Sequence, residues 1–227
     1  RKMSVFFDVG PPPKKNFTGS YQLGPLSFEY FLDDQKIITN CGYGKQISKK
    51  AKLVSRLTSA QSTLCLNNTS VTLLERNKII NNTFGAFIKK NFNVYDATFE
   101  KNNFFLTASA THNAYEKKFG YLHKRSLTIS RESQELKGSD YLIKKGKLSN
   151  DINFSIRFHL YPGISAVETI GKNSILIQIQ KNKSLVFSSP NQKISIEKSI
   201  FLGRNQILNN FCITINGNIS NNNETID

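Results

Sequence analysis

The chain has 227 residues, and its 31 Lys and Arg against 16 Asp and Glu give a formal net charge of +15. This length fits one large domain, and 38% apolar residues supply a sizeable core. No run of about 18 apolar residues occurs, which excludes a transmembrane helix. The positive charge favours a polyanionic partner, namely nucleic acid, an anionic membrane or an acidic polysaccharide.

The chain opens on a segment, 1–8, that predicts a strand. A chain that begins inside a strand is expected to be part of a longer protein, so the absence of a targeting segment says little about its location. Segment 10–15 holds three consecutive prolines, and it is expected to form a loop because proline lacks the amide N–H that a central strand needs.

Two predicted strands, 26–32 and 36–40, flank the turn sequence Asp33-Asp34. The segment 46–59 breaks the strand pattern, because its apolar side chains fall at helical spacing. It predicts one short basic helix across one end of the fold, with Arg56 and the neighbouring lysines on a solvated face.

The later segments alternate apolar and polar residues with a period of two, as half-buried antiparallel strands do. Short turn sequences between them predict hairpins. The sequence therefore predicts an all-β domain over residues 1–227, a two-sheet antiparallel β-sandwich with one short helix. The alternating segments are 119–129, 154–161, 174–180, 184–189 and 211–215.

The three cysteines, Cys41, Cys65 and Cys212, are odd in number and widely spaced. They predict neither a disulfide framework nor a zinc motif, and we expect each to be a small buried apolar residue. The sequence also contains no Gly-x-Ser-x-Gly and no phosphate-binding loop.

Arg157, His159 and Tyr161 lie at period two on the polar face of one predicted strand. Such a strip can bind a carboxylate or sulfate and stack on a sugar ring. The alternative is an ordinary solvated sheet face.

A second group runs from His112 through Tyr115 to His123 and Arg125. Two imidazoles, a phenol and a guanidinium across one hairpin suit proton abstraction next to a carboxylate, so the first three are the candidate catalytic residues. The alternative is that the face of His123 belongs to the core, since it also carries apolar side chains such as Leu127.

Six stretches, in this order and spacing, extend over nearly the whole chain: Asp-Val-Gly-Pro-Pro-Pro at 8–13, Leu-Ser-Phe-Glu at 26–29, Asn-Cys-Gly at 40–42, Ala-Gln-Ser-Thr-Leu at 60–64, Phe-Gly-Tyr-Leu-His-Lys-Arg at 119–125 and Ile-Arg-Phe-His-Leu-Tyr-Pro at 156–162. Together they resemble the C-terminal β-sandwich domain of the heparinase II/III-like family.

The resemblance implies a bacterial, periplasmic or cell-envelope protein with an α/α-toroid domain upstream of this chain. Typical members are polysaccharide lyases that cleave uronic-acid polymers, such as heparan sulfate or alginate, by β-elimination. In that reaction a group neutralises the uronate carboxylate, a base removes the C5 proton and an acid protonates the leaving oxygen. The resemblance places the main catalytic tyrosine and the neutralising group on the toroid, so this chain alone is expected to be inactive.

Active members carry a His-x-His-x-Asp-like run, and this sequence has Ser20, Gln22 and Gly24 at those three positions. The resemblance places further zinc ligands near Asn40 and Gln61, which are amides and poor ligands beside imidazole and carboxylate. We therefore expect no zinc and no other cofactor. Tyr21 and Gln22 join Arg125, Arg157, His159 and Tyr161 as predicted substrate-binding residues.

The leading hypothesis is thus the β-sandwich portion of a polysaccharide lyase, with an acidic polysaccharide and the upstream toroid as partners. The alternative, motivated by the amides, is a non-catalytic module that binds acidic carbohydrate or assists envelope assembly. The sequence argues against nucleic acid, because it lacks a helix-turn-helix, an aromatic RNA-binding strand and a zinc finger.

Overall fold

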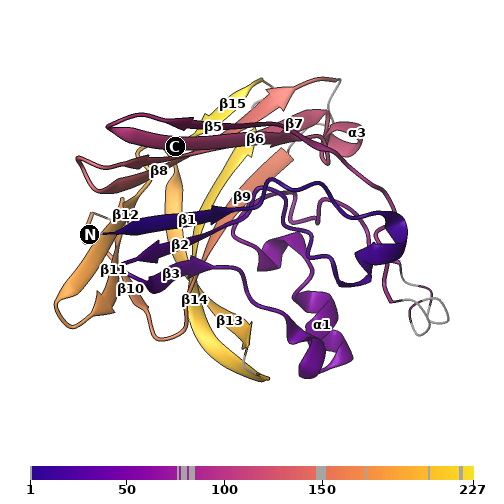
Figure 1. Ribbon diagram of the computed structural model, residues 1–227, viewed down its shortest axis with the longest axis horizontal. Helices are drawn as coiled ribbons and strands as arrows, with labels where there is room; N and C mark the ends of the chain where they lie inside the picture. Colours follow the sequence, from indigo (N-terminus) through magenta and orange to yellow (C-terminus); the bar gives the residue numbers. More distant parts are fainter. Residues whose placement is uncertain are drawn as a thin grey trace.

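The structure is a computed structural model that describes residues 2–75, 77, 81, 85–146, 152–171, 173–203, 205–219 and 222–227, with the backbone alone described at 15 and 16. Antiparallel strands dominate it, and two large sheets face each other (Figure 1). The all-β sandwich predicted from the sequence is confirmed, and a small third sheet is added at one side.

The larger sheet has seven strands in the order β1-β2-β3-β9-β14-β13, and β4 also pairs with β9. Every pair in it is antiparallel. The strands are β1 (Met3–Phe7), β2 (Phe28–Leu32), β3 (Gln35–Thr39), β4 (Leu64–Leu66), β9 (Ile152–Leu160), β13 (Lys193–Gly203) and β14 (Gln206–Ile219).

The second large sheet has five strands in the order β15-β8-β7-β6-β5, and it forms the upper layer in Figure 1. The small sheet has the order β10-β11-β12. The strands are β5 (Val94–Lys101), β6 (Phe105–His112), β7 (Tyr121–Ser130), β8 (Glu135–Lys144) and β15 (Glu224–Ile226) in the former, with β10 (Ser165–Glu168), β11 (Ser174–Gln180) and β12 (Lys183–Ser188) in the latter.

One apolar core lies between the two large sheets. Phe28 and Ile156 of the larger sheet and Leu127 and Leu142 of the smaller one belong to the same buried cluster. The period-two alternation in the sequence is the cause, because successive strand side chains point to opposite faces and only one face of each sheet meets the core.

Tight turns join neighbouring strands. Asp33 and Asp34, between β2 and β3, have φ values of 49° and 65°. Two successive positive φ values match the twist of a two-residue hairpin, and aspartate tolerates this region better than most residues do. The turn predicted at these two residues is confirmed.

The helical segment is shorter than the sequence predicts, and a second short helix is present. A 3₁₀ turn, η2 (Gly44–Gln46), precedes α1 (Lys49–Val54), and η3 (Thr58–Ala60) follows it. Ser48 caps α1 by accepting a hydrogen bond from the amide of Ala51. The remaining helical elements are η1 (Lys15–Ser20) and α3 (Glu116–Phe119).

The predicted solvated face of the helix is wrong at one residue, because Arg56 is 0% exposed. Helix α1 ends before it, at Val54. Helical spacing therefore no longer governs the direction of the Arg56 side chain, which turns into the protein.

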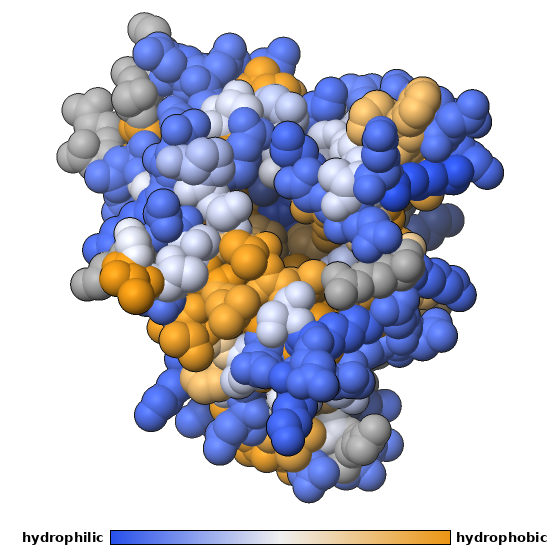
Figure 2. Space-filling model, turned by 90° about the vertical axis from the view of Figure 1, so that its left-hand side faces the viewer, coloured by the Kyte–Doolittle hydropathy of each residue, from blue (hydrophilic) through white to orange (hydrophobic). Residues whose placement is uncertain are grey.

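The side of the molecule that carries β12 is hollowed. A cavity of about 810 Å³ lies there, and its lining includes Phe187, Leu185, Ile177 and Leu136. Figure 2 views the molecule from this side and shows apolar side chains gathered around a depression.

All three cysteines are free and buried, as predicted. Burial raises the pKa of Cys41 to about 12 and that of Cys65 to about 11, so both remain neutral thiols. Within the described part of the chain, every helix is too short or too polar to cross a membrane.

Candidate functional site

A hollow of about 340 Å³ lies where β1 ends and β2 begins. The segment before β2, the residue after β3 and the residue after η3 complete it. Its lining is Phe6, Phe7, Asp8, Gln22, Gly24, Ser27, Phe28, Glu29, Asn40 and Gln61. Four of the five positions that the family resemblance marks, Gln22, Gly24, Asn40 and Gln61, are therefore brought together.

The amides at this hollow are bound to the backbone. The side-chain Nε2 of Gln22 donates to the carbonyl oxygens of Gly42 at 2.7 Å and Ser55 at 3.1 Å. Nε2 of Gln61 donates to the same Ser55 carbonyl at 2.7 Å. Oδ1 of Asn40 accepts a hydrogen bond of 2.8 Å from the amide of Ser62. The three side chains thus hold the surrounding loops in place.

The side chain of Gln61 also fills the space beside Gly24. A Cβ atom added at Gly24 would lie 2.7 Å from Cγ of Gln61 and 2.8 Å from its Cβ. Such distances are too short for any side chain at position 24 while Gln61 keeps its place. The carboxylate that the family resemblance implies at this position has no room here.

The residues at this hollow do not fit a zinc ion. Zinc in proteins is held by thiolate, imidazole or carboxylate, and neutral amides are not among its usual ligands. Among the residues that the structure describes, no group of three His, Cys, Asp or Glu side chains is placed to hold a metal. Two carboxylates line the hollow. Glu29, on β2, already pairs with Nζ of Lys36 at 2.7 Å and accepts from Thr39 at 3.0 Å. Asp8, directly after β1, accepts a hydrogen bond of 3.2 Å from the amide of Gly10.

We expect added zinc to leave the thermal unfolding midpoint of the chain within about 1 °C of its value in chelator, because no metal-binding free energy is available to the folded state. Calorimetry or circular dichroism checks this. A rise of several degrees that disappears in the Gln22→Ala variant would show that a metal does bind at the hollow.

Tyr21 and Arg56 fix the segment that leads into the hollow. The buried Arg56 donates from Nε to the carbonyl of Tyr21 at 2.8 Å and from Nη2 to that of Thr18 at 2.7 Å. The Oη atom of Tyr21 is buried and forms no hydrogen bond with the described residues. Burial, reinforced by Asp8, raises the pKa of Tyr21, so its phenol stays protonated and is a poor base near neutral pH.

The imidazoles of His112 and His123 form one buried chain of hydrogen bonds. Nδ1 of His112 accepts from the amide of Ala114 at 3.2 Å, so Nε2 carries the proton and donates to Nδ1 of His123 at 3.0 Å. Nε2 of His123 then donates to Oδ1 of Asp140 at 2.5 Å. Both histidines are 0% exposed, and burial lowers the pKa of each.

Arg125 connects this chain of hydrogen bonds to the hollow. Its Nε and Nη2 atoms donate to the two carboxylate oxygens of Asp140, each at 2.8 Å. Its Nη1 atom donates to the carbonyls of Leu26 and Ser62, each at 2.9 Å. Four hydrogen bonds occupy a guanidinium that has five N–H donors. Arg125 therefore holds two loops of the hollow against β7.

Tyr115 is 1% exposed, and its Oη donates to the carbonyl of Leu64 at 2.8 Å. Burial raises its pKa well above the ordinary value. The structure brings Tyr115, His112 and His123 together, since the two histidine rings and the tyrosine ring are in contact. It places all three inside the core, and their catalytic role stays a prediction.

The predicted strip Arg157, His159 and Tyr161 is divided among different surroundings. Arg157 is half-buried and binds Oγ of Ser155 at 2.7 Å and Oδ1 of Asn68 at 3.1 Å. His159 is 4% exposed, lies between Ser199 and the carbonyl of Ser59, and has a pKa lowered by burial to about 4. Their roles in substrate binding stay predictions.

Tyr161 lies past the end of β9 and is half-buried, with its ring edge-on to that of Phe201.

The sequence did not reveal the structural roles of Arg56 and Asp140, which bind Thr18 and Arg125 respectively. Each of these two residues is recognisable only as a buried charged side chain, and the sequence does not show which charged side chains are buried.

Comparison with known proteins decides the family. The family model described as "Heparinase II/III-like, C-terminal" matches residues 1–223. The chain belongs to this family. No curated protein matches the chain in sequence.

Among solved structures, heparan sulfate lyase HepC from Pedobacter heparinus is similar to this member of the heparinase II/III-like C-terminal family. It has a TM-score of 0.74 at 16% identity, and the match covers 99% of this chain and 32% of HepC. A HepC mutant matches in the same way at 15% identity. A heparinase III with methylated lysines has a TM-score of 0.65 at 13% identity, with 90% of this chain and 29% of that protein covered. The chain thus spans about a third of the length of these structures, and the likeness shows the fold.

Proposed function

We propose that this chain is the β-sandwich portion of a polysaccharide lyase that cleaves uronic-acid-containing polysaccharides by β-elimination. The family match over residues 1–223 carries the proposal. The surplus of 31 basic over 16 acidic residues supports it, since charge attracts and steers a polyanionic substrate.

In this proposal an α/α-toroid domain upstream of the chain supplies the catalytic base and the group that neutralises the uronate carboxylate. The base takes the C5 proton, the electron pair forms the new C4–C5 double bond, and the glycosidic oxygen leaves with a proton from an acid. The sandwich contributes the hollow at Gln22, Asn40 and Gln61 and a surface that docks to the toroid. We further propose a bacterial periplasmic or cell-envelope location.

The described residues of this chain support a positioning role over a catalytic one. The hollow presents amides and two carboxylates, one of them paired with a lysine, while His112, His123 and Tyr115 are at most 1% exposed. A base must reach the proton that it abstracts, within hydrogen-bond distance in a substrate complex. Arg56 and Arg125, through their carbonyl partners, hold the loops on which the hollow depends.

We expect the isolated chain to produce no unsaturated uronate from heparan sulfate, alginate or another polyuronate, and the full-length protein to produce it. The ultraviolet absorbance of the conjugated product measures both. Turnover by the chain alone would contradict the division of labour between sandwich and toroid. If the full-length protein binds these polymers and cleaves none, the non-catalytic carbohydrate-binding module is the correct function.

A further inference from the structure

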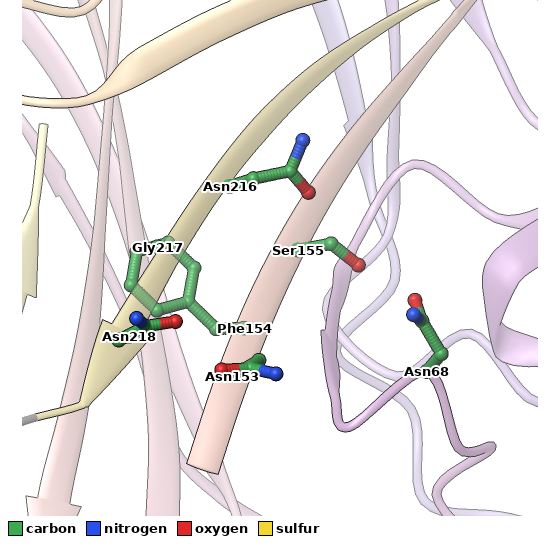
Figure 3. Close-up of a pocket in the computed structure, with 7 residues that line it drawn as sticks. All are labelled: Asn68, Asn153, Phe154, Ser155, Asn216, Gly217 and Asn218. Carbon is green, nitrogen blue, oxygen red and sulfur yellow. The ribbon is translucent and has the colours of Figure 1, made fainter. Parts of the chain in front are cut away.

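A second hollow, of about 380 Å³, lies on the seven-stranded sheet, and Figure 3 shows it. It shares no lining residue with the hollow at Gln22. Its volume is within the range of about 300–1,000 Å³ that small-molecule sites occupy. Its lining is Asn68, Asn153, Phe154, Ser155, Asn216, Gly217 and Asn218.

The register of β9 and β14 builds one wall of this hollow. Asn216 lies opposite Ser155, and Asn218 lies opposite Asn153. Since directly opposed residues and their i±2 neighbours share one face of an antiparallel pair, the four polar side chains gather on the same face. The intervening Phe154 belongs to the core on the other face.

The turn after β4 builds the opposite wall, and Figure 3 shows the side chain of Asn68 across the gap from Ser155. This turn is fixed to β9 in two ways. The amide of Asn67 donates to the carbonyl of Asn153 at 2.8 Å, and the amide of Asn153 donates to Oδ1 of Asn67 at 2.7 Å. The wall is therefore preformed, which lowers the cost of ordering a site on binding.

The chemistry of the lining suits sugar hydroxyls. Asn68, Asn153, Asn216 and Asn218 are exposed, while Ser155 is 5% exposed and lies deeper. Each amide offers two N–H donors and a carbonyl acceptor, and each hydroxyl of a sugar both donates and accepts. Four amides around a serine can thus satisfy several hydroxyls at once.

A guanidinium stands at the edge of this hollow. Arg157 donates to Oγ of Ser155 and to Oδ1 of Asn68, which holds it between the two walls with further N–H donors unused by these bonds. Lys193 lies opposite Asn216 on β13 and is exposed. No carboxylate occurs among the residues that line the hollow in the described part of the chain.

We propose that this hollow is a subsite for an acidic sugar of a glycan, in which Arg157 binds the carboxylate and the asparagines bind the hydroxyls. An arginine beside neutral amides, without a competing carboxylate in the lining, favours a single negative charge accompanied by many hydroxyls. The choice of a uronate as the ligand rests on the proposed function, whereas the position of the subsite rests on its own residues.

The test measures binding of hexasaccharides to the full-length protein by calorimetry. A polymannuronate hexasaccharide is expected to bind, a heparan sulfate hexasaccharide tests tolerance of sulfate, and neutral cellohexaose is expected to bind at least about tenfold more weakly. Arg157→Gln keeps a side chain that can hydrogen-bond but removes the charge, and it should weaken polymannuronate binding by about tenfold or more.

Arg131→Gln is the matched control, because Arg131 is exposed in the β7–β8 turn and its variant removes the same charge elsewhere. It should leave the affinity unchanged. Asn216→Asp adds a negative charge at an exposed position of β14, where it repels an acidic glycan, so binding should fall by at least about tenfold.

Equal effects of Arg157→Gln and Arg131→Gln would overturn the subsite, since binding would then depend only on net charge. Absence of polymannuronate and heparan sulfate binding, or an unchanged affinity in Asn216→Asp, would also overturn it. These outcomes are separate from cleavage: a protein that cleaves while the variants bind normally keeps the proposed function and loses the subsite. If the protein never cleaves but the variants lose binding, the subsite stands and the proposed lyase function falls.

Discussion

Replacing Asp140 with asparagine is expected to lower the free energy of unfolding by about 3–5 kcal/mol. The substitution leaves the guanidinium of Arg125, which is 1% exposed, without its carboxylate partner. A buried charge without a partner retains the cost of its desolvation while it loses the attraction that offset this cost. Urea unfolding of the chain, followed by circular dichroism, gives the difference.

Glu100→Gln is the matched control for the loss of a carboxylate. Glu100 is exposed on β5, and no ion pair involves it among the residues that the structure describes. Its replacement should change the free energy of unfolding by no more than about 0.5 kcal/mol. A loss below about 1 kcal/mol in Asp140→Asn would mean that the pair with Arg125 is not what holds β7 and β8 to the loops of the hollow.

Lowering the pH from 7.5 to 5 is expected to remove roughly 2 kcal/mol of stability through His159 alone, since burial lowers its folded-state pKa to about 4 from an ordinary 6.5. The unfolded chain takes up the proton first, so this stability is fully present above about pH 6.5 and is lost as the pH falls towards 4. Burial also lowers the pKa of His112 and His123, and both act in the same direction.

Asp140 does not contribute in this window. Burial alone would raise its pKa, but Arg125 and His123 outweigh burial and lower it to about 2. Its share of the stability is present above its ordinary pKa of 3.8 and is lost only as the pH falls from there towards 2.

The pH dependence is measured by urea unfolding at several pH values. His159→Gln is the informative variant, since an amide can still donate to the carbonyl of Ser59 and does not titrate. The difference between pH 7.5 and pH 5 should be roughly 2 kcal/mol smaller in this variant. A free energy of unfolding that stays constant across this range in the parent chain would contradict a lowered pKa for His159.

The strands that sequence analysis predicted are those with one face in the core. β9 alternates apolar and polar residues over its whole length. β11 does so except at Leu176, and its buried residues alternate with less buried ones throughout. β5 escaped prediction because six of its eight residues are exposed, so no apolar face marks it. An edge strand with water on both faces has no periodicity to detect.

The candidate site was only partly predictable, for a related reason. The family resemblance marked the positions of Gln22, Asn40 and Gln61 as parts of one site, and the structure places all three at one hollow. The partner of Arg125 was out of reach, because Asp140 lies directly opposite it on β8, a strand that the sequence did not predict. Without the register of that hairpin, two charged residues 15 positions apart give no sign of contact.

The carbonyl of Ser55 accepts hydrogen bonds from the side-chain amides of both Gln22 and Gln61, and this constrains any redesign of the hollow. An imidazole at position 22 alone would leave Gly42 and Ser55 with fewer donors, and an aspartate at position 24 alone would collide with Gln61. An engineered metal centre here would therefore require Gln22, Gly24 and Gln61 to be exchanged in one step. Each single exchange produces an intermediate that folds less well and still coordinates nothing.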